Sequence, residues 1–289
     1  MRTIKAKHKA VYEPIAHLVT YRAMPTHAVP MNAIDPFIFL NHHGWQEYHP
    51  HNAGLPFGPH PHRGFETVTF ILEGDLTHKD SSGVVSVIKK GSVQWMTAGS
   101  GLIHAEVSSP QFKAQGGPLE ILQLWVNLPA KYKMTEPKYV GLQKNDIPVA
   151  EYDNGMVKAH IVSGNWNGTE GPFKPLTDIH LSFIYFNPGS RFQINVPKEQ
   201  NVFLYIVKGE IKVNGDLAQI HHLVEFNNDG QVVEMKATAD AIILFGYATP
   251  FREPFFAYGP FVMNSREEIM QAYDDMKNGK FGNGEELMD

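Results

Sequence analysis

The chain has 289 residues, 43% of them hydrophobic and 19% charged, and its formal net charge is −5. This is an ordinary globular composition for one large or two medium domains, and it excludes disorder, collagen and coiled coils. The chain has no cysteine, which excludes disulfides, thiolate zinc sites, iron–sulfur clusters and cysteine nucleophiles. Any metal must therefore be held by His, Asp, Glu or backbone oxygen.

The chain begins with a basic segment, Met1–Ala10, that no apolar signal core follows. The longest apolar stretches, such as Ala241–Phe245, are far shorter than the roughly 20 residues that a membrane helix needs. No basic stripe with regularly spaced aromatic residues is present, so we expect no direct nucleic-acid partner. We expect a cytoplasmic protein that makes no membrane contact.

Most of the chain is predicted to form short strands, because Val, Ile, Phe and Tyr recur with a period of two between turn residues. Turn residues stand at Asp80–Gly83 and at Asn214–Gly215. Many short strands without alternating long helices favour antiparallel sandwiches or barrels over a parallel sheet, so we predict an all-β protein. In chain order, the expected strands are Phe65–Leu72, Val84–Lys89, Val93–Thr97, Leu119–Leu128, Val157–Val162, His180–Phe186, Val202–Val207 and Ala241–Phe245.

An internal repeat links the two halves of the chain. Residues 70–76 (FILEGDL) resemble residues 205–211 (YIVKGEI) at an offset of 135 residues, and each copy reads as a strand, a glycine turn and a second strand. A repeat at about half the chain length predicts two copies of one all-β domain. We place the two domains at residues 1–135 and 136–289, with Lys131–Asp153 as the connection.

One clear helix is predicted at Ser265–Asn278. Ser265 and Glu268 have the spacing of a capping box, and Gly279 follows the last turn. The apolar stripe of this helix consists of Ile269, Tyr273 and Met276. We expect Phe281–Asp289 to be a frayed acidic tail.

Histidine is unevenly distributed, since eleven of the 15 copies lie within the first 104 residues. Residues 58–64 (GPHPHRG) contain His60 and His62, and residues 101–106 (GLIHAE) contain His104 and Glu106. In an extended strand, residues two apart point to the same face, so each pair can form a clamp. If the two strands face one another in a barrel, three imidazoles and one carboxylate converge on one point.

This ligand set suits a divalent first-row ion such as Fe(II), Mn(II), Co(II), Ni(II) or Cu(II), with Zn(II) also possible. Four protein ligands on a six-coordinate ion leave two positions for small molecules. An isolated His-x-His pair is more often a pair satisfied by its neighbours, but the second pair, His104 with Glu106, favours metal binding.

Four segments of the chain resemble the pirin family of the cupin superfamily, and the match runs nearly from end to end. They are residues 58–66 (GPHPHRGFE), 94–106 (QWMTAGSGLIHAE), 124–129 (LWVNLP) and 258–265 (YGPFVMNS). The resemblance implies a bicupin: two jelly-roll type β-barrel domains in tandem, with a short C-terminal helix.

The resemblance also implies where the metal is held and what it does. The N-terminal cupin domain, residues 1–135, would hold one metal, usually iron as Fe(II), through His60, His62, His104 and Glu106. The C-terminal cupin domain, residues 136–289, would lack metal ligands. Some bacterial members of the family act as flavonol dioxygenases, whereas eukaryotic members are nuclear cofactors of transcription factors, so a eukaryotic member would be nuclear as well.

The second half departs from the ligand pattern. The repeat places Asn195 where His60 stands and Pro197 where His62 stands, so this half cannot bind metal in the same way. His221 and His222 are adjacent and would point to opposite faces of a strand, which favours solvent-side or turn positions.

Several other residues have open roles. Ordinary cupins use a carboxylate after the first His pair, whereas the resemblance moves that role to Glu106, so we expect Glu66 at the outer face or rim of its strand or, alternatively, hydrogen-bonded to a ligand imidazole. His42 or His43 is a candidate for a supporting or substrate-binding role. The expected surface histidines are His49, His51 and His78, and the aromatic or apolar residues that line a pocket or fill the core are Phe57, Trp95, Met96 and Trp125.

Two functions follow from this sequence. The first is an Fe(II)-dependent dioxygenase that acts on a small aromatic substrate, a flavonol such as quercetin, together with O₂. In it Glu106 is either an anionic ligand or the catalytic acceptor of the substrate proton. The second is a non-enzymatic, redox-sensing regulatory protein that binds a protein partner. In either case we expect metal loss as the pH falls well below about 6.5, since imidazole must be neutral to bind metal.

Overall fold

The computed structural model describes residues 1–287 of the chain. It divides into two compact units. The first barrel contains Tyr12–Thr20, Phe39–Lys144 and the residues from Phe251 on, and the second barrel contains Met1–Val11, Tyr21–Ile38 and Asn145–Pro250. Each barrel thus includes a segment from the opposite end of the chain. The predicted boundary between residues 135 and 136 stays a prediction.

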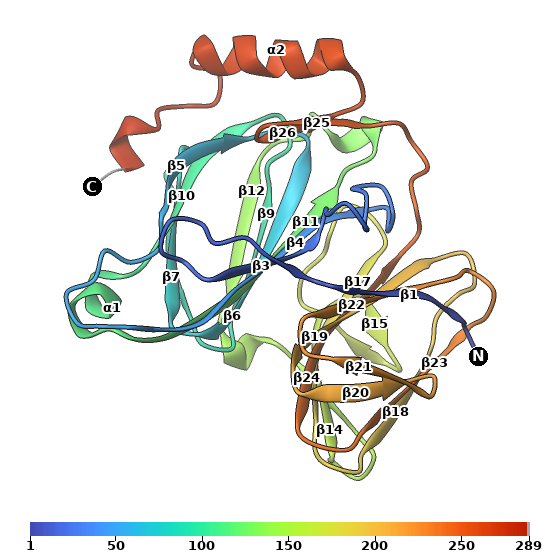
Figure 1. The fold of residues 1–289 in the computed structure, drawn as a ribbon. Coiled ribbons are helices and arrows are strands. Elements are labelled where there is room, and N and C mark those ends of the chain that lie inside the picture. Colours follow the sequence, from blue (N-terminus) through green and yellow to red (C-terminus); the bar gives the residue numbers. More distant parts are fainter. Residues whose placement is uncertain (288–289) are drawn as a thin grey trace. The chain divides into compact units, whose positions relative to one another are not determined.

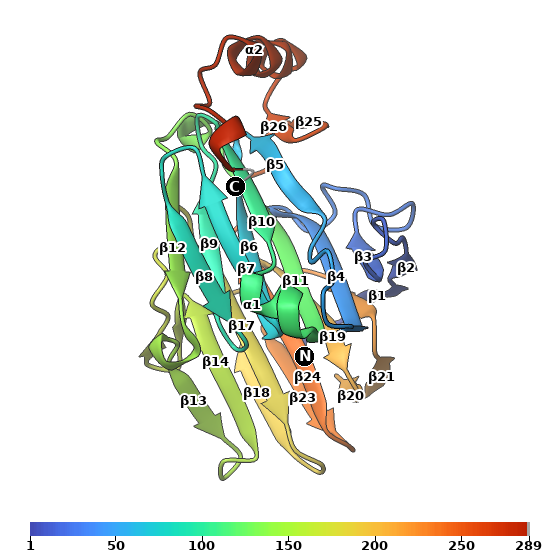
Figure 2. The same ribbon diagram turned by 90° about the vertical axis from the view of Figure 1, so that its left-hand side faces the viewer.

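The first barrel consists of two antiparallel sheets (Figure 2). The larger sheet begins with the order β12-β9-β6-β11-β4, with β12 at Lys138–Leu142, β9 at Val93–Thr97, β6 at Phe65–Glu73, β11 at Gly117–Asn127 and β4 at Phe37–Tyr48. Two short strands, β3 (Thr20–Met24) and β2 (Val11–Tyr12), continue this sheet beyond β4. The smaller sheet has the order β5-β10-β7-β8, with β5 at Phe57–His62, β10 at Leu102–Val107, β7 at Asp75–Asp80 and β8 at Val85–Lys89. One side chain of β10, Glu106, accepts hydrogen bonds from side chains of β6, β9 and β11, so the two sheets face each other.

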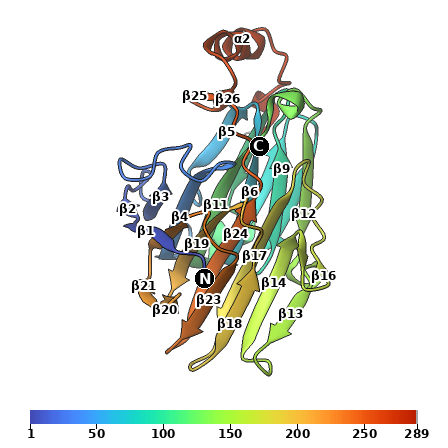
Figure 3. The same cartoon turned by 90° about the vertical axis from the view of Figure 1, so that its right-hand side faces the viewer.

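The second barrel repeats this arrangement (Figure 3). Its larger sheet has the order β1-β22-β19-β24-β17-β14-β13, with β1 at Ile4–Lys9, β22 at His222–Phe226, β19 at Asn201–Lys208, β24 at Ala241–Ala248, β17 at Ile179–Phe186, β14 at Val157–Ser163 and β13 at Val149–Tyr152. Its smaller sheet has the order β18-β23-β20-β21, with β18 at Arg191–Asn195, β23 at Val232–Ala237, β20 at Glu210–Val213 and β21 at Asp216–Gln219. A large cluster of buried apolar side chains fills the barrel, including Trp166, Phe186, Leu204 and Phe245.

The remaining elements are short. They are α1 (Pro110–Gln115), η1 (Ala130–Tyr132), η2 (Lys144–Asp146), β15 (Asn165–Trp166), β16 (Thr169–Glu170), β25 (Phe256–Tyr258), β26 (Phe261–Met263), α2 (Arg266–Lys277) and η3 (Glu285–Leu287). Figure 1 shows α2 beyond the β25–β26 hairpin, at the end of the first barrel where β5 lies. Across the described residues, no helix has the length and apolar character needed to span a membrane.

The all-β, two-barrel prediction is confirmed, and so is the internal repeat. Gly74, between β6 and β7, has φ 82°, and Gly209, between β19 and β20, has φ 75°. An added Cβ at Gly209 would lie 2.2 Å from the carbonyl oxygen of Asp240, so both the positive φ and the close approach require glycine there. The order β5-β10-β7-β8 matches the order β18-β23-β20-β21 strand for strand.

The predicted connection Lys131–Asp153 contains the division between the two units, which falls between Lys144 and Asn145. It also contains β12, which pairs with β9, and β13, which pairs with β14. One local prediction was wrong. The tail is not frayed at Phe281, which is 2% exposed and packs in a cluster with Phe261. Residues 288–289 of the predicted tail lie outside the described part of the chain.

The C-terminal helix is confirmed. Ser265 caps α2 with both hydrogen bonds of the capping box, because Glu268 also accepts from the Ser265 backbone. Its buried residues are Ile269, Ala272 and Asp275, while Tyr273 and Met276 of the predicted stripe are partly buried.

Candidate metal centre

Strands β5 and β10 bring three predicted ligands together. Their register pairs His104 with His60 and Leu102 with His62, as neighbouring antiparallel strands. The ring centroids of His60 and His104 are 4.3 Å apart, and those of His62 and His104 are 5.0 Å apart. One nitrogen of each ring lies within 4.8 Å of the other two, and this is the single such group of potential ligands among residues 1–287.

Hydrogen bonds set which ring nitrogen can bind a metal. Nδ1 of His60 lies 2.7 Å from the carbonyl oxygen of Gly58, and Nδ1 of His62 lies 3.2 Å from that of Pro260. Because a carbonyl oxygen only accepts, each Nδ1 must donate, and each Nε2 keeps its lone pair. A backbone carbonyl on the far nitrogen is the usual support of a metal-binding imidazole.

His104 provides the test of whether the site fits a metal. Its ring is fully buried, and neither ring nitrogen has a hydrogen-bond partner in the structure. A buried polar atom without a partner is costly, so such a nitrogen needs an explanation. A divalent ion shared with His60 and His62 would bind one of these nitrogens, and the donor set therefore fits a metal.

The electrostatics favour neutral rings. Burial, together with the neighbouring His60, lowers the pKa of His62 from 6.5 to about 3. Burial, followed by the nearby His60, His62 and His78, holds the pKa of His104 well below its usual range. Since only neutral imidazole binds metal, the site keeps its rings in the ligand form.

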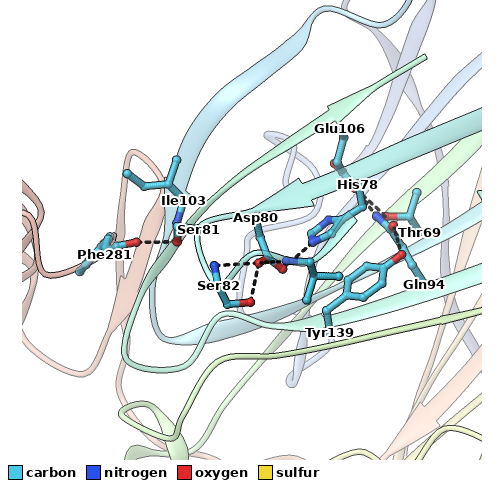
Figure 4. A network of polar contacts seen from close by, with 11 residues as sticks. Thr69, His78, Asp80, Ser81, Ser82, Gln94, Ile103, Glu106, Tyr139 and Phe281 are labelled. Carbon is cyan, nitrogen blue, oxygen red and sulfur yellow. Dashed lines mark hydrogen bonds and ion pairs between the residues drawn. The ribbon is translucent and has the colours of Figure 1, made fainter. Parts of the chain in front are cut away.

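Glu106 lies on the same strand as His104 but is not a member of the three-histidine group. Its carboxylate accepts hydrogen bonds on both oxygens, and Figure 4 shows Thr69 and Gln94 beside it. Thr69 donates to Oε1 at 3.2 Å, the Gln94 amide also donates to Oε1, and Gln123 donates to Oε2 at 2.7 Å. Neutral donors from three strands of the facing sheet thus orient this buried carboxylate.

A second layer of side chains supports the Glu106 network. Tyr139 donates from its hydroxyl to Oε1 of Gln94 at 3.1 Å, which turns the Gln94 amide nitrogen toward Glu106. The Tyr139 ring stacks on His78 with centroids 4.0 Å apart, and Nε2 of His78 contacts Asp80 at 2.8 Å (Figure 4).

The surface prediction for His78 was wrong. Its side chain is fully buried, because β7 pairs with β10 so that His78 stands opposite Glu106. The predictions for His49 and His51 are confirmed, since both are exposed. The period of two could have found the network, since Gln94 shares a strand face with Met96 and Gln123 shares one with Trp125 along predicted strands.

The walls beside the three histidines are partly aromatic. The Trp125 ring lies 5.3 Å from His62 and 4.4 Å from Phe65, between centroids. Met96 is buried and, by strand alternation, shares a face with Gln94, whereas Trp95 points to the opposite face. Trp125 is therefore the predicted pocket aromatic that contacts the site.

His42 and His43 do not belong to the three-histidine group. Both are buried on β4, where Nε2 of His42 contacts Glu120 at 2.9 Å and Nδ1 of His43 contacts the Thr20 hydroxyl at 2.9 Å. The predicted pocket residue Phe57 contacts His43, with ring centroids 5.3 Å apart.

Glu66 lies on the outer face of its strand, as one of the two alternatives predicted, but it is buried there. This side chain is 1% exposed and accepts a hydrogen bond from the Thr97 hydroxyl at 2.6 Å. By strand alternation it faces away from Phe65, which contacts His62. Burial raises the pKa of Glu66 to about 7, against the opposing hydrogen bonds of Thr97 and Trp95.

The second barrel has no counterpart of the site in the part of the chain that the structure describes. Asn195 and Pro197 are exposed, whereas the barrel interior is apolar. His221 has φ 63° in the turn after β21, and Nδ1 of His222 contacts the Gln219 carbonyl at 3.0 Å. His221 agrees with the turn alternative of the prediction, whereas His222 is the first residue of β22 and is half-buried.

Two barrels of one topology, with a three-histidine group in one of them of which His62 and His104 are buried, define a bicupin with a candidate metal centre. The family model named Pirin matches residues 18–126, and that of the pirin C-terminal cupin domain matches residues 183–282. Pirin-1 of Arabidopsis thaliana is 40% identical over 261 residues, covering 88% of this chain and 86% of that protein. A pirin-like protein of Caulobacter vibrioides is 38% identical over 248 residues, covering 86% and 87%. The chain belongs to the pirin family.

A solved structure extends the similarity to the whole fold. The crystal structure of quercetin 2,3-dioxygenase from Acinetobacter baumannii has a TM-score of 0.92 and 32% sequence identity to this chain. The match covers 98% of this chain and 99% of that one, so both barrels and the C-terminal segment are included.

Proposed function

We propose that the chain is a metal-dependent dioxygenase of the quercetin 2,3-dioxygenase type, which acts on flavonols with O₂ as the second substrate. The observation that carries this proposal is the fully buried His104, whose two ring nitrogens lack partners beside His60 and His62. The substrate class is supported by the similarity to the Acinetobacter baumannii quercetin 2,3-dioxygenase.

The three histidines would hold one divalent metal, with Glu106 as the proposed fourth ligand. We propose Fe(II), while Mn, Co, Ni, Cu and Zn match the same donors. When bound, such an ion supplies a Lewis-acidic and redox-active centre that favours the anionic form of a flavonol hydroxyl. The hydrogen bonds of His60 to Gly58 and of His62 to Pro260 aim the two Nε2 atoms before any metal arrives.

Other residues of the site would bind and orient the substrate. The half-buried indole of Trp125, packed on Phe65, offers a flat apolar surface beside His62. A planar flavonol held against this surface would place its hydroxyl near the imidazoles. Exclusion of water by the buried walls strengthens polar interactions at the hydroxyl.

Glu106 has two proposed roles. It would either bind the metal as an anionic ligand or accept the proton of the substrate hydroxyl. Thr69, Gln94 and Gln123 hold its two oxygens in place, so either role would be carried out by an already oriented carboxylate.

Oxygen uptake on addition of quercetin tests the proposal. The Fe(II)-loaded protein should consume O₂, and His62→Ala should abolish the uptake. His49→Ala, which changes an exposed histidine outside the group, should retain it. No uptake above the His62→Ala level, with Fe(II) shown to be bound, would overturn the enzymatic proposal and favour the redox-sensing protein that binds a protein partner. The cytoplasmic location stays a prediction.

A further inference from the structure

We propose that the C-terminal hairpin β25–β26 positions His62 for metal binding, and that two buried cations fasten this hairpin to the turn after β5. The inference rests on the metal centre proposed above. The central residue, Pro260, lies 198 positions further along the chain than His62, and both lie within the first barrel.

The contact at the centre of the inference is backbone to imidazole. The Pro260 carbonyl, between β25 and β26, accepts from Nδ1 of His62 at 3.2 Å. This bond selects the tautomer of His62 whose Nε2 lone pair is available, and it restrains the rotation of the ring. His60 donates the equivalent bond to the Gly58 carbonyl, two residues away, whereas His62 depends on Pro260 near the far end of the chain.

The backbone of the hairpin lies directly against the turn that follows His62. Val262 donates its amide to the Arg63 carbonyl at 3.1 Å. At Gly64, with φ 88°, an added Cβ would lie 2.0 Å from the Val262 carbonyl oxygen. The glycine in this turn therefore permits the close approach that places Pro260 over His62.

Arg63 is the first cation that holds the hairpin region in place. Its side chain is 4% exposed, and it donates from Nε to the Ser100 carbonyl at 2.7 Å and from a guanidinium NH₂ group to Asp275 at 2.8 Å. The guanidinium also lies 4.6 Å from the ring centroid of Phe281. Arg63, the residue next to His62, thus connects the turn after β5 to helix α2, which directly follows the hairpin.

Lys133 is the second cation. It is 1% exposed, and its ammonium donates to the Gly64 carbonyl at 2.8 Å, the Val262 carbonyl at 2.9 Å and the Asn127 side chain at 2.7 Å. An ammonium has three donors, and these contacts use all three. Lys133 therefore bridges the turn after β5 and strand β26, on the two sides of the His62–Pro260 contact.

The first experiment uses the metal-free wild-type chain. Labelling histidine with ¹⁵N and assigning His62 by comparison with His62→Gln gives the tautomer of this ring by NMR. We expect the proton on Nδ1 and a hydrogen-bonded Nδ1–H. A proton on Nε2 would overturn the inference, whatever the protein does with metal.

The second experiment measures the dissociation constant of Co(II) for two variants. Asp275→Asn removes the charge that pairs with Arg63, and Lys133→Met removes the bridge, while neither changes a proposed ligand. We expect each to weaken Co(II) binding by about tenfold, in the range found when support of a ligand histidine is lost, and to mix the His62 tautomers. The control Asp274→Asn removes an equal charge from an exposed position of α2 and should leave both readouts unchanged.

The outcomes separate this inference from the proposed function. Unchanged Co(II) affinity and an unchanged His62 tautomer in both folded variants would overturn the inference and leave the metal centre intact. Failure of the wild-type chain to bind Co(II) or Fe(II) would instead overturn the proposed function, and the tautomer measurements would still decide the role of the hairpin. If a variant does not fold, the tautomer of His62 in the wild-type chain remains the measurement that tests the role of the hairpin.

Discussion

Within residues 1–287, the Glu106 carboxylate receives its hydrogen bonds from neutral groups, two amides and one hydroxyl. A carboxylate can accept on both oxygens, whereas a glutamine side chain offers one accepting oxygen and one donating nitrogen. Replacing Glu106 by Gln therefore removes the negative charge and sets one donor against another. The Glu106→Gln substitution can therefore distinguish the two proposed roles of Glu106, metal ligand and proton acceptor.

We predict that Glu106→Gln keeps part of its metal through the three histidines but loses turnover of quercetin by about 10²-fold or more, the usual contribution of a positioned proton acceptor. Metal content and oxygen uptake are measured on the same preparation. Glu73→Gln is the matched control, since Glu73 lies in the same barrel and its carboxylate pairs with the exposed Lys90. Undiminished uptake by Glu106→Gln would exclude the proton-acceptor role.

The buried imidazoles also make stability depend on pH. The pKa of His62 is about 3 in the folded chain and about 6.5 when the chain is unfolded. Between these values the unfolded state binds a proton that the folded state does not. The contribution of His62 to the free energy of unfolding is therefore complete above about pH 6.5, and it is lost as the pH decreases toward 3.

We predict that the metal-free protein loses about 1.4 kcal/mol of stability per pH unit for each such histidine within this window. Urea unfolding at pH 7.5, 6 and 5 measures the slope, and His62→Gln should make it shallower. The low pKa of His62 points in the same direction as the expectation from the sequence, that metal is lost as the pH falls well below about 6.5. A slope unaffected by His62→Gln would contradict the prediction.

At the scale of elements, the period-two pattern located the strands well. The predicted Val93–Thr97 is β9 itself, and Phe65–Leu72 differs from β6 by one residue. The pattern succeeds because successive side chains of a strand point to opposite faces of the sheet. It does not state which strand lies beside which, and therefore it could not place His78 opposite Glu106.

The β25–β26 hairpin shows the opposite case. Its two strands have three residues each, too few for a periodic signal, and they are joined through Gly259 and Pro260. Strand β26 is buried because of what it packs against, since Phe261 contacts Phe281 and Tyr273. This segment therefore forms a β-hairpin because of its tertiary packing, and no local sequence pattern predicts it.

At the scale of the whole molecule, each barrel incorporates a segment from the opposite end of the chain. In the second barrel this segment is β1, which pairs with β22. Arg2, just before β1, is fully buried and donates to the carbonyl oxygens of four residues. These residues are Pro197, Lys198, Gln200 and Gly230.

We predict that Arg2→Met destabilises the second barrel by on the order of 3 kcal/mol, because buried carbonyl groups lose their donor. Arg191→Met, at an exposed position of β18, should change stability by less than about 0.5 kcal/mol. Denaturant unfolding of both variants measures the difference. Equal stability of the two would show that the N-terminal segment contributes little to this barrel.

The sequence by itself determined the local features: the strands, the capping box of α2, the glycine turns of the repeat and the two strands that carry His60, His62 and His104. These features depend on residues close together in the chain, and alternation and turn chemistry read them directly. The tertiary structure decided the supports of the site. Gln94, Gln123 and Tyr139 surround Glu106, and Pro260 reaches His62, because sheets close and chain ends pack across long separations. No local pattern encodes such contacts, since they depend on which strands become neighbours and on how closely two backbones approach.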